Sequence, residues 1–144
     1  MSQTLDVNVL VYATDRGSPF HDKAKALVEQ FLTGPDLVYL LWPVTFGYLR
    51  IVTHPGLLDA PLSPDEAARN IDQFAAQPHV RFVGEGDGFW SVYRRVADPV
   101  RPKGNLVPDA HLVALMRQHG IATIWTRDRD FRKFEGITVR DPFA

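Results

Sequence analysis

The chain has 144 residues, of which 45% are apolar and 23% charged, and it carries a formal net charge of −1 and no cysteine. These values fit a single globular domain over residues 1–144, and they exclude a disordered chain, disulfide bonds and thiolate metal sites. No apolar run approaches the roughly 20 residues that span a bilayer, so we expect no membrane contact and a cytoplasmic location, and nucleic-acid binding would need a local basic patch.

Short apolar runs alternate with helical patterns along the first half of the chain. Residues 4–12 are rich in Val and Leu and predict a buried strand. Ser18 and Pro19 are typical of a helix start, and Gly34 with Pro35 ends that helix near residue 33. The pattern then predicts a strand at 37–41, a helix at 43–53 and another helix that begins at the capping box 63–66.

The second half continues the same alternation. It predicts, in order, a strand at 80–83, a helix at 89–97, a loop at 98–107, a helix at 108–119, a strand at 121–125, a short helix at 129–134 and a strand at 137–139. Short apolar strands that alternate with helices predict an α/β fold, with a parallel sheet covered on both faces. Ligands of such sheets bind beyond the carboxyl ends of the strands, and this is where we look for a functional site.

Four aspartates stand near these strand ends. Asp6 lies in the first predicted strand, Asp109 opens a late helix, and Asp128 and Asp130 follow the fourth strand. Each alone has an ordinary explanation, namely a solvent-facing carboxylate, a helix cap or a turn residue. Because the first and fourth strands are expected to be neighbours, Asp6, Asp109 and Asp128 together predict carboxylates that converge on one point.

Converging carboxylates repel each other, and a hard divalent cation relieves that repulsion. Mg²⁺ and Mn²⁺ prefer oxygen ligands and keep several waters. Such an ion activates water and offsets the charge on a phosphate that is being cleaved. Basic residues flank the acids, among them Lys103 before Asp109 and Arg129 beside Asp128. For these two, a phosphate contact and a merely solvated charged surface are both open.

Four segments occur in a fixed order along the chain: LDVNVLVYA at 5–13, GYLRIVTHP at 47–55, GNLVPDAHLVAL at 104–115 and TRDRDF at 126–131. This set resembles the PIN domains, and in particular the virulence-associated protein C (VapC) toxins of bacterial toxin–antitoxin operons. The resemblance implies a three-layer α/β sandwich with a central parallel sheet and helices on both faces. It also implies a toxin of a type II toxin–antitoxin system that hydrolyses RNA phosphodiesters with Mg²⁺ or Mn²⁺, forms a homodimer and binds a cognate antitoxin protein.

The resemblance also assigns roles to individual residues. Asp6, Asp109 and Asp128 match the acids that hold the metal and carry the catalysis. Asn8 matches the structural partner of the first acid, and Thr126 matches a residue that forms a hydrogen bond close to the site.

One acid of the family pattern is missing. The family usually has a Glu in the helix just before a segment like YLR, and this chain has Gly47 there. Three explanations are open: Asp130 or another carboxylate compensates, the metal is held more weakly with more water, or the activity is reduced. We expect Asp130 to support the site.

Two alternatives to an RNA-cleaving toxin remain open. Gly47 favours a non-catalytic PIN-like module that only binds nucleic acid, and nothing in the sequence distinguishes RNA from DNA as the substrate of a nuclease. A response-regulator receiver is disfavoured, because it needs adjacent acids after the first strand and a lysine after the last.

Overall fold

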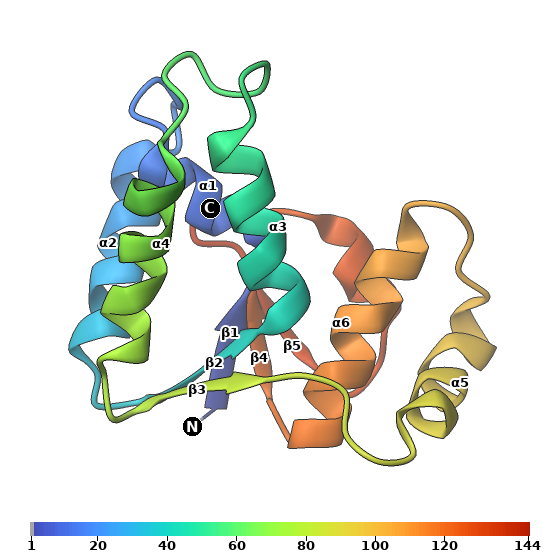
Figure 1. The fold of residues 1–144 in the computed structure, drawn as a ribbon. Coiled ribbons are helices and arrows are strands. Elements are labelled where there is room, and N and C mark those ends of the chain that lie inside the picture. The colour runs from blue at the N-terminus through green and yellow to red at the C-terminus, as the bar shows by residue number, and fades with distance from the viewer. Residues whose placement is uncertain (1) are drawn as a thin grey trace.

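A computed structural model describes residues 2–144. Its strands are parallel and form one sheet in the order β3-β2-β1-β4-β5, so that β1 is the central strand (Figure 1). The strands are β1 (Ser2–Leu5), β2 (Leu37–Leu41), β3 (Val80–Val83), β4 (Thr123–Trp125) and β5 (Thr138–Arg140). This sheet confirms the predicted fold class.

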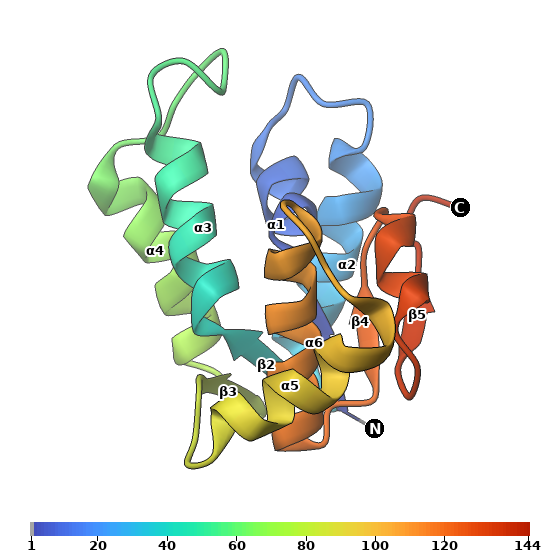
Figure 2. The same ribbon diagram turned by 90° about the vertical axis from the view of Figure 1, so that its right-hand side faces the viewer.

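Helices cover both faces of the sheet. One face carries α1 (Val7–Thr14), α2 (His21–Thr33), α3 (Trp42–Thr53) and α4 (Pro64–Ala75), and the other carries α5 (Phe89–Val100) and α6 (Leu106–His119) (Figures 1 and 2). A 3₁₀ helix, η1 (Arg129–Lys133), follows β4 and packs against α6. Within residues 2–144, no helix combines the length and apolar character that crossing a bilayer requires.

Buried apolar side chains form the core between these layers. Helix α6 is buried at Leu112, Leu115 and Met116, as its sequence pattern predicts, and Gly120 ends it in a left-handed conformation (φ 67°). Because α6 lies against the sheet, its first turn is held firmly beside the carboxyl ends of the strands. Asp109 belongs to that turn.

The N-terminal segment differs from the sequence prediction of one strand over 4–12. The strand ends at Leu5, and the chain turns into α1 from Val7 onward. A short apolar run fits a buried helix as well as a buried strand. Asp6 decides between them, because its side chain accepts a hydrogen bond from the Val7 N–H at 2.7 Å and caps the helix. Asp6 therefore lies at the carboxyl end of β1 and not inside it.

Other helix boundaries also differ from their predictions. Helix α2 starts at His21, because the Ser18 hydroxyl accepts from the Phe20 N–H within a preceding turn. Helix α5 continues through Pro99, and α6 begins before Pro108, so the predicted loop 98–107 shrinks to residues 101–105. Proline is tolerated in the first turn of a helix, where its missing N–H would have no partner.

Candidate metal centre

The central pair of strands brings the first acid to the edge of the sheet. β1 pairs with β4 in parallel, with Leu5 opposite Trp125, and the pairing continues as the Asp6 N–H donates to the Trp125 carbonyl at 3.0 Å. Asp6 and Thr126, the next residue of each strand, therefore lie side by side. This pairing confirms the expected neighbourhood of the first and fourth strands.

Asp6 is held by two hydrogen bonds. Its Oδ1 accepts from the Val7 N–H, and its Oδ2 accepts from the Thr126 hydroxyl at 3.0 Å. The same Thr126 hydroxyl accepts from the Asp128 N–H at 2.9 Å, so it connects the two acids through one buried side chain. Among residues 2–144, Asn8 does not bond Asp6; it is exposed and lines a neighbouring pocket. The side-chain partner of Asp6 in this structure is therefore Thr126 and not Asn8, which the resemblance had assigned to that role.

Three further carboxylates gather in front of Asp6. Asp128 caps η1, and its Oδ1 accepts from the Asp130 N–H at 2.9 Å. Asp109 projects from the first turn of α6, against which η1 packs. Asp109, Asp128 and Asp130 each offer an oxygen, and these oxygens all lie within 4.8 Å of one another. Asp6 is not a member of this group of three.

The four carboxylates influence each other's ionisation. Burial, followed by the charges of Asp128, Asp6 and Asp130, raises the pKa of Asp109 to about 7, and Lys133 opposes the rise. Burial and, to a smaller extent, Asp128 also raise the pKa of Asp6, against the hydrogen bonds that Asp6 accepts. The site therefore resists holding all its negative charge unless a positive charge joins it.

The donor set fits a hard divalent cation. It consists of carboxylate oxygens, the ligands that Mg²⁺ and Mn²⁺ prefer. Oxygens bound to one Mg²⁺ at about 2.1 Å lie at most about 4.2 Å apart, so separations within 4.8 Å require only a small movement of the half-buried Asp109 and the exposed Asp128 and Asp130. Burial is the main cause of the raised pKa of Asp109, and a cation would offset the further contribution that the neighbouring carboxylates make.

The positive residues around the acids have different surroundings. Lys133 pairs with Asp130 at 3.2 Å, an i,i+3 pair on η1, so this basic residue lies directly beside the acids. Arg129 starts η1 next to Asp128, and Lys103 lies in the loop before α6. Both side chains are exposed, and neither forms an ion pair within residues 2–144.

Gly47 occupies the position of the missing acid on α3. A Cβ atom placed there would lie 3.4 Å from the Val7 Cγ2 atom, in ordinary contact. Since Val7 follows Asp6, this side of α3 faces the beginning of α1 and the deep part of the site. The glycine thus leaves the site without a carboxylate on its α3 side.

Comparison with known proteins gives consistent results. The PIN domain model matches residues 4–137. The chain is 75% identical over 144 residues to Ribonuclease VapC48 of Mycobacterium tuberculosis, and the match covers 100% of this chain and 99% of that protein. Two solved structures share its fold. One is the sarcin–ricin-loop-cleaving toxin VapC20 of Mycobacterium tuberculosis (TM-score 0.65, 17% identity, 94% of this chain and 98% of that chain). The other is a toxin–antitoxin complex from Klebsiella pneumoniae (TM-score 0.63, 15% identity, 99% and 98%).

Proposed function

The chain belongs to the PIN-domain family, among its VapC ribonucleases, and on this premise we propose that it is a metal-dependent endoribonuclease and the toxin of a type II toxin–antitoxin pair. One observation carries the proposal: three carboxylates, one with its pKa raised to about 7, meet at the carboxyl edge of the central strands. Cellular RNA as the substrate places the action of the protein in the cytoplasm.

Asp109, Asp128 and Asp130 would hold a divalent cation, Mg²⁺ or Mn²⁺. When bound, such a cation makes a water more acidic and offsets the charge that develops on the phosphate. Asp6 lies deeper and adds negative charge to the site, while its bond to Thr126 fixes the loop that carries Asp128. We therefore propose that Asp130, as a ligand of the cation, takes the place of the acid that is missing at Gly47.

The chain's own groups then act on the substrate. The carboxylates of Asp109 and Asp128 accept hydrogen bonds from the attacking water and orient it toward the phosphorus. Asp6 is already fixed by two hydrogen bonds, so the site needs little reorganisation during the reaction. The exposed guanidinium of Arg129 and the ammonium of Lys103 hold the RNA phosphates. The oxygen of water forms a bond to the phosphorus while the bond to the leaving ribose oxygen breaks, and in net one proton of that water ends on the leaving oxygen.

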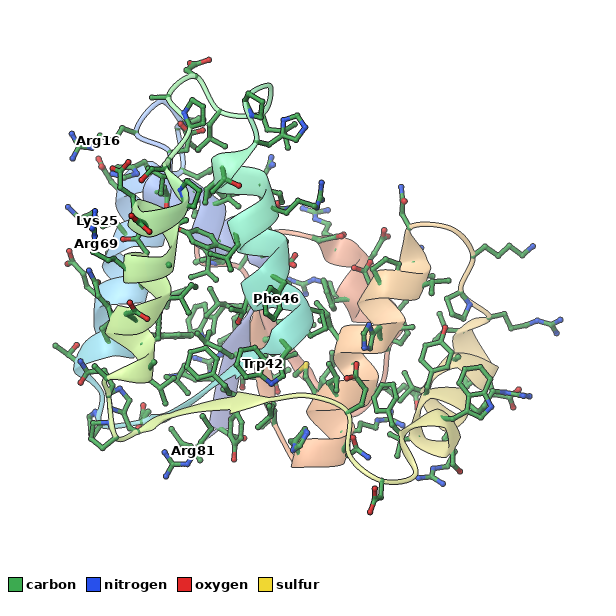
Figure 3. The ribbon with its side chains drawn as sticks, viewed as in Figure 1. Arg16, Lys25, Trp42, Phe46, Arg69 and Arg81 are labelled. Atoms are coloured by element: carbon green, nitrogen blue, oxygen red, sulfur yellow. The ribbon has the colours of Figure 1, made fainter. Side chains whose placement is uncertain are left out.

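A groove between α2 and α4 suits the antitoxin. It has a volume of about 780 Å³ and an apolar lining that includes Leu32 and Ile71. Arg16, Lys25 and Arg69 line its edge and project from the same side of the molecule (Figure 3). Carboxylates also line it, namely Asp15, Glu29, Asp59 and Glu66. An amphipathic segment that carries both charges on its polar face matches such a groove, and we assign this segment to the antitoxin.

A separate apolar patch suits a second copy of the chain. Trp42 and Phe46 lie one turn apart on α3, with 42% and 62% of their surfaces exposed (Figure 3). Their ring centroids are 5.9 Å apart, and Phe82 stacks on Trp42 at 5.1 Å. Neighbouring exposed aromatic rings are typical of protein–protein contacts. We therefore place the homodimer contact on this patch, away from the α2–α4 groove.

Cleavage assays with and without a cation test the proposed function. The purified chain is incubated with structured RNA and with single-stranded DNA in EDTA, Mg²⁺ or Mn²⁺. We expect cleavage of RNA only when a cation is present. RNA binding without cleavage under all conditions would favour the non-catalytic module, which Gly47 supports, and equal cleavage of DNA would favour a DNA-directed nuclease. Asp36→Asn, an exposed carboxylate before β2, is the matched control and should cleave like the wild type.

A further inference from the structure

A second, smaller pocket lies directly beside the acidic centre and shares Asp128 with it. It has a volume of about 420 Å³. Its other lining residues are Asn8, Tyr12, Arg127, Arg129 and Asp141. Building on the proposed function, we propose that this pocket binds the base of a nucleotide next to the scissile phosphate and selects guanine.

Arg127 is held in place by aromatic rings. Its guanidinium carbon lies 4.4 Å from the ring centroid of Phe20. Phe20 packs in turn against Tyr12 at 5.1 Å and against Phe143 at 4.8 Å. This cation–π contact orients the guanidinium without occupying its N–H donors, and Arg127 forms no ion pair within residues 2–144. An oriented arginine with free donors reads two adjacent acceptors, as the O6 and N7 atoms of guanine provide.

Asp141 supplies the complementary acceptor. It is half-buried, and its Oδ1 accepts from the Phe143 N–H at 2.8 Å, which fixes the carboxylate at the pocket wall. Within residues 2–144, no arginine or lysine approaches this carboxylate closely enough to form an ion pair. An ionised carboxylate accepts hydrogen bonds only, and guanine offers the N1–H and the 2-amino group as neighbouring donors on its Watson–Crick edge.

The charges of the pocket favour a base over a second phosphate. Asp128 and Asp141 contribute two carboxylates to the wall, and Arg127 and Arg129 contribute two guanidinium groups, so the pocket has no excess of positive charge with which to attract a second phosphate. Both arginines flank Asp128 in the sequence, but only Arg127 is held against an aromatic ring among the contacts of residues 2–144, so we assign Arg127 to the base and Arg129 to the scissile phosphate.

Guanine fits this arrangement better than the other bases do. It is the base that presents two acceptors on one edge and two donors on the adjacent edge, matching Arg127 and Asp141. Adenine has an amino donor where guanine has O6, so it would set a donor against the guanidinium. Pyrimidines have no N7. Asn8, at the start of α1, is exposed in the same pocket and offers an amide to the ribose.

Atom-level changes in the RNA test the inference. An RNA with randomised positions around the cut should show guanine enriched at one flanking position. Replacing that guanine by inosine, which lacks the 2-amino group, or by 7-deazaguanine, which lacks N7, should slow wild-type cleavage about tenfold, the scale of one good bidentate contact. Asp141→Asn should lose the sensitivity to inosine and keep the sensitivity to 7-deazaguanine. Arg127→Gln should show the converse.

Matched controls separate this inference from the proposed function. Arg94→Gln, on the exposed side of α5, should keep the wild-type pattern. Asp141→Asn retains an oxygen that accepts from the Phe143 N–H, so its fold is preserved, and a thermal melt checks this. Wild-type cleavage with no flanking guanine preference, or with a preference that both pocket variants retain, overturns the inference and leaves the proposed function intact.

Binding of GMP provides a second readout that does not need catalysis. Titration of GMP and CMP into the wild type, followed by NMR, should show preferential binding of GMP that Asp141→Asn weakens about tenfold. If the wild type cleaves no RNA with any cation but binds GMP in this way, the proposed function fails and the pocket assignment stands. If neither cleavage nor GMP binding occurs, both fail.

Discussion

Replacing Asp109 by asparagine should remove most of the pH dependence of cation binding. Burial and the neighbouring carboxylates raise the pKa of Asp109 to about 7. With that pKa, about one tenth of the side chain is ionised at pH 6 and about nine tenths at pH 8. A cation binds only the deprotonated ligand, so the apparent affinity of the wild type for Mn²⁺ should rise about tenfold over this range.

Isothermal titration calorimetry with Mn²⁺ at pH 6, 7 and 8 measures this dependence. Asp109→Asn should bind Mn²⁺ more weakly at pH 8 and change much less with pH. The control Asp36→Asn lies in the connection between α2 and β2 and should follow the wild type at every pH. Equal wild-type affinities at pH 6 and pH 8 would refute the reasoning, because they would mean that no proton leaves Asp109 when the cation binds.

The same proton affects the stability of the cation-free protein. The pKa of Asp109 is about 7 in the folded chain and 3.8 ordinarily, so the folded chain binds the proton more tightly. The resulting stabilisation is present in full below pH 3.8 and is lost as the pH rises through 7. Melting in EDTA should therefore occur at lower temperature at pH 8 than at pH 5, with a smaller difference for Asp109→Asn. Added Mn²⁺ should restore the wild-type melting temperature at pH 8.

Two further variants test how the site is built. Gly47→Glu adds a carboxylate on the side of α3 that faces Val7, where a Cβ atom fits at 3.4 Å from the Val7 side chain. Calorimetry should therefore show tighter Mn²⁺ binding. The control Gly47→Ala should leave the Mn²⁺ affinity unchanged and stabilise the helix by up to about 1 kcal/mol. Unaltered affinity in Gly47→Glu would place this position outside the metal centre. Thr126→Val removes the hydroxyl that connects Asp6 and Asp128. Urea unfolding should show that the free energy of unfolding falls by about 1–3 kcal/mol, and RNA cleavage should slow. A variant with wild-type stability and cleavage rate would show that this hydroxyl does not organise the site.

Much of the fold could be predicted because local chemistry decides it. The capping box at Ser63 and Glu66 starts α4 where the sequence places it, and both hydrogen bonds of the box are present. The strand at 37–41 also agrees residue for residue. The strand predicted for the segment after Leu5 was wrong. Its apolar side chains fit a buried strand and a buried helix equally well, and the hydrogen bond by which Asp6 caps α1 decides for the helix.

The candidate site was predictable in outline and not in detail. The rule that ligands lie at the carboxyl ends of parallel strands points to Asp6 and Asp128, and the pairing of β1 with β4 confirms their neighbourhood. That Asp130 joins Asp109 and Asp128 within 4.8 Å depends on how η1 packs on α6, a tertiary contact that no local pattern encodes. The pocket at Arg127 depends likewise on rings from distant segments.

Single-turnover RNA cleavage by aspartate variants tests the central claim most directly. Wild type, Asp6→Asn, Asp109→Asn and the control Asp36→Asn are compared in saturating Mn²⁺ at pH 8, with thermal melts to verify folding. Each asparagine keeps the size of the side chain and removes one negative charge from the acidic centre or, in the control, from the distant surface. We predict that Asp6→Asn and Asp109→Asn lose cleavage while Asp36→Asn retains the wild-type rate. If both site variants are folded and cut RNA at the wild-type rate, the acidic centre is not the catalytic site.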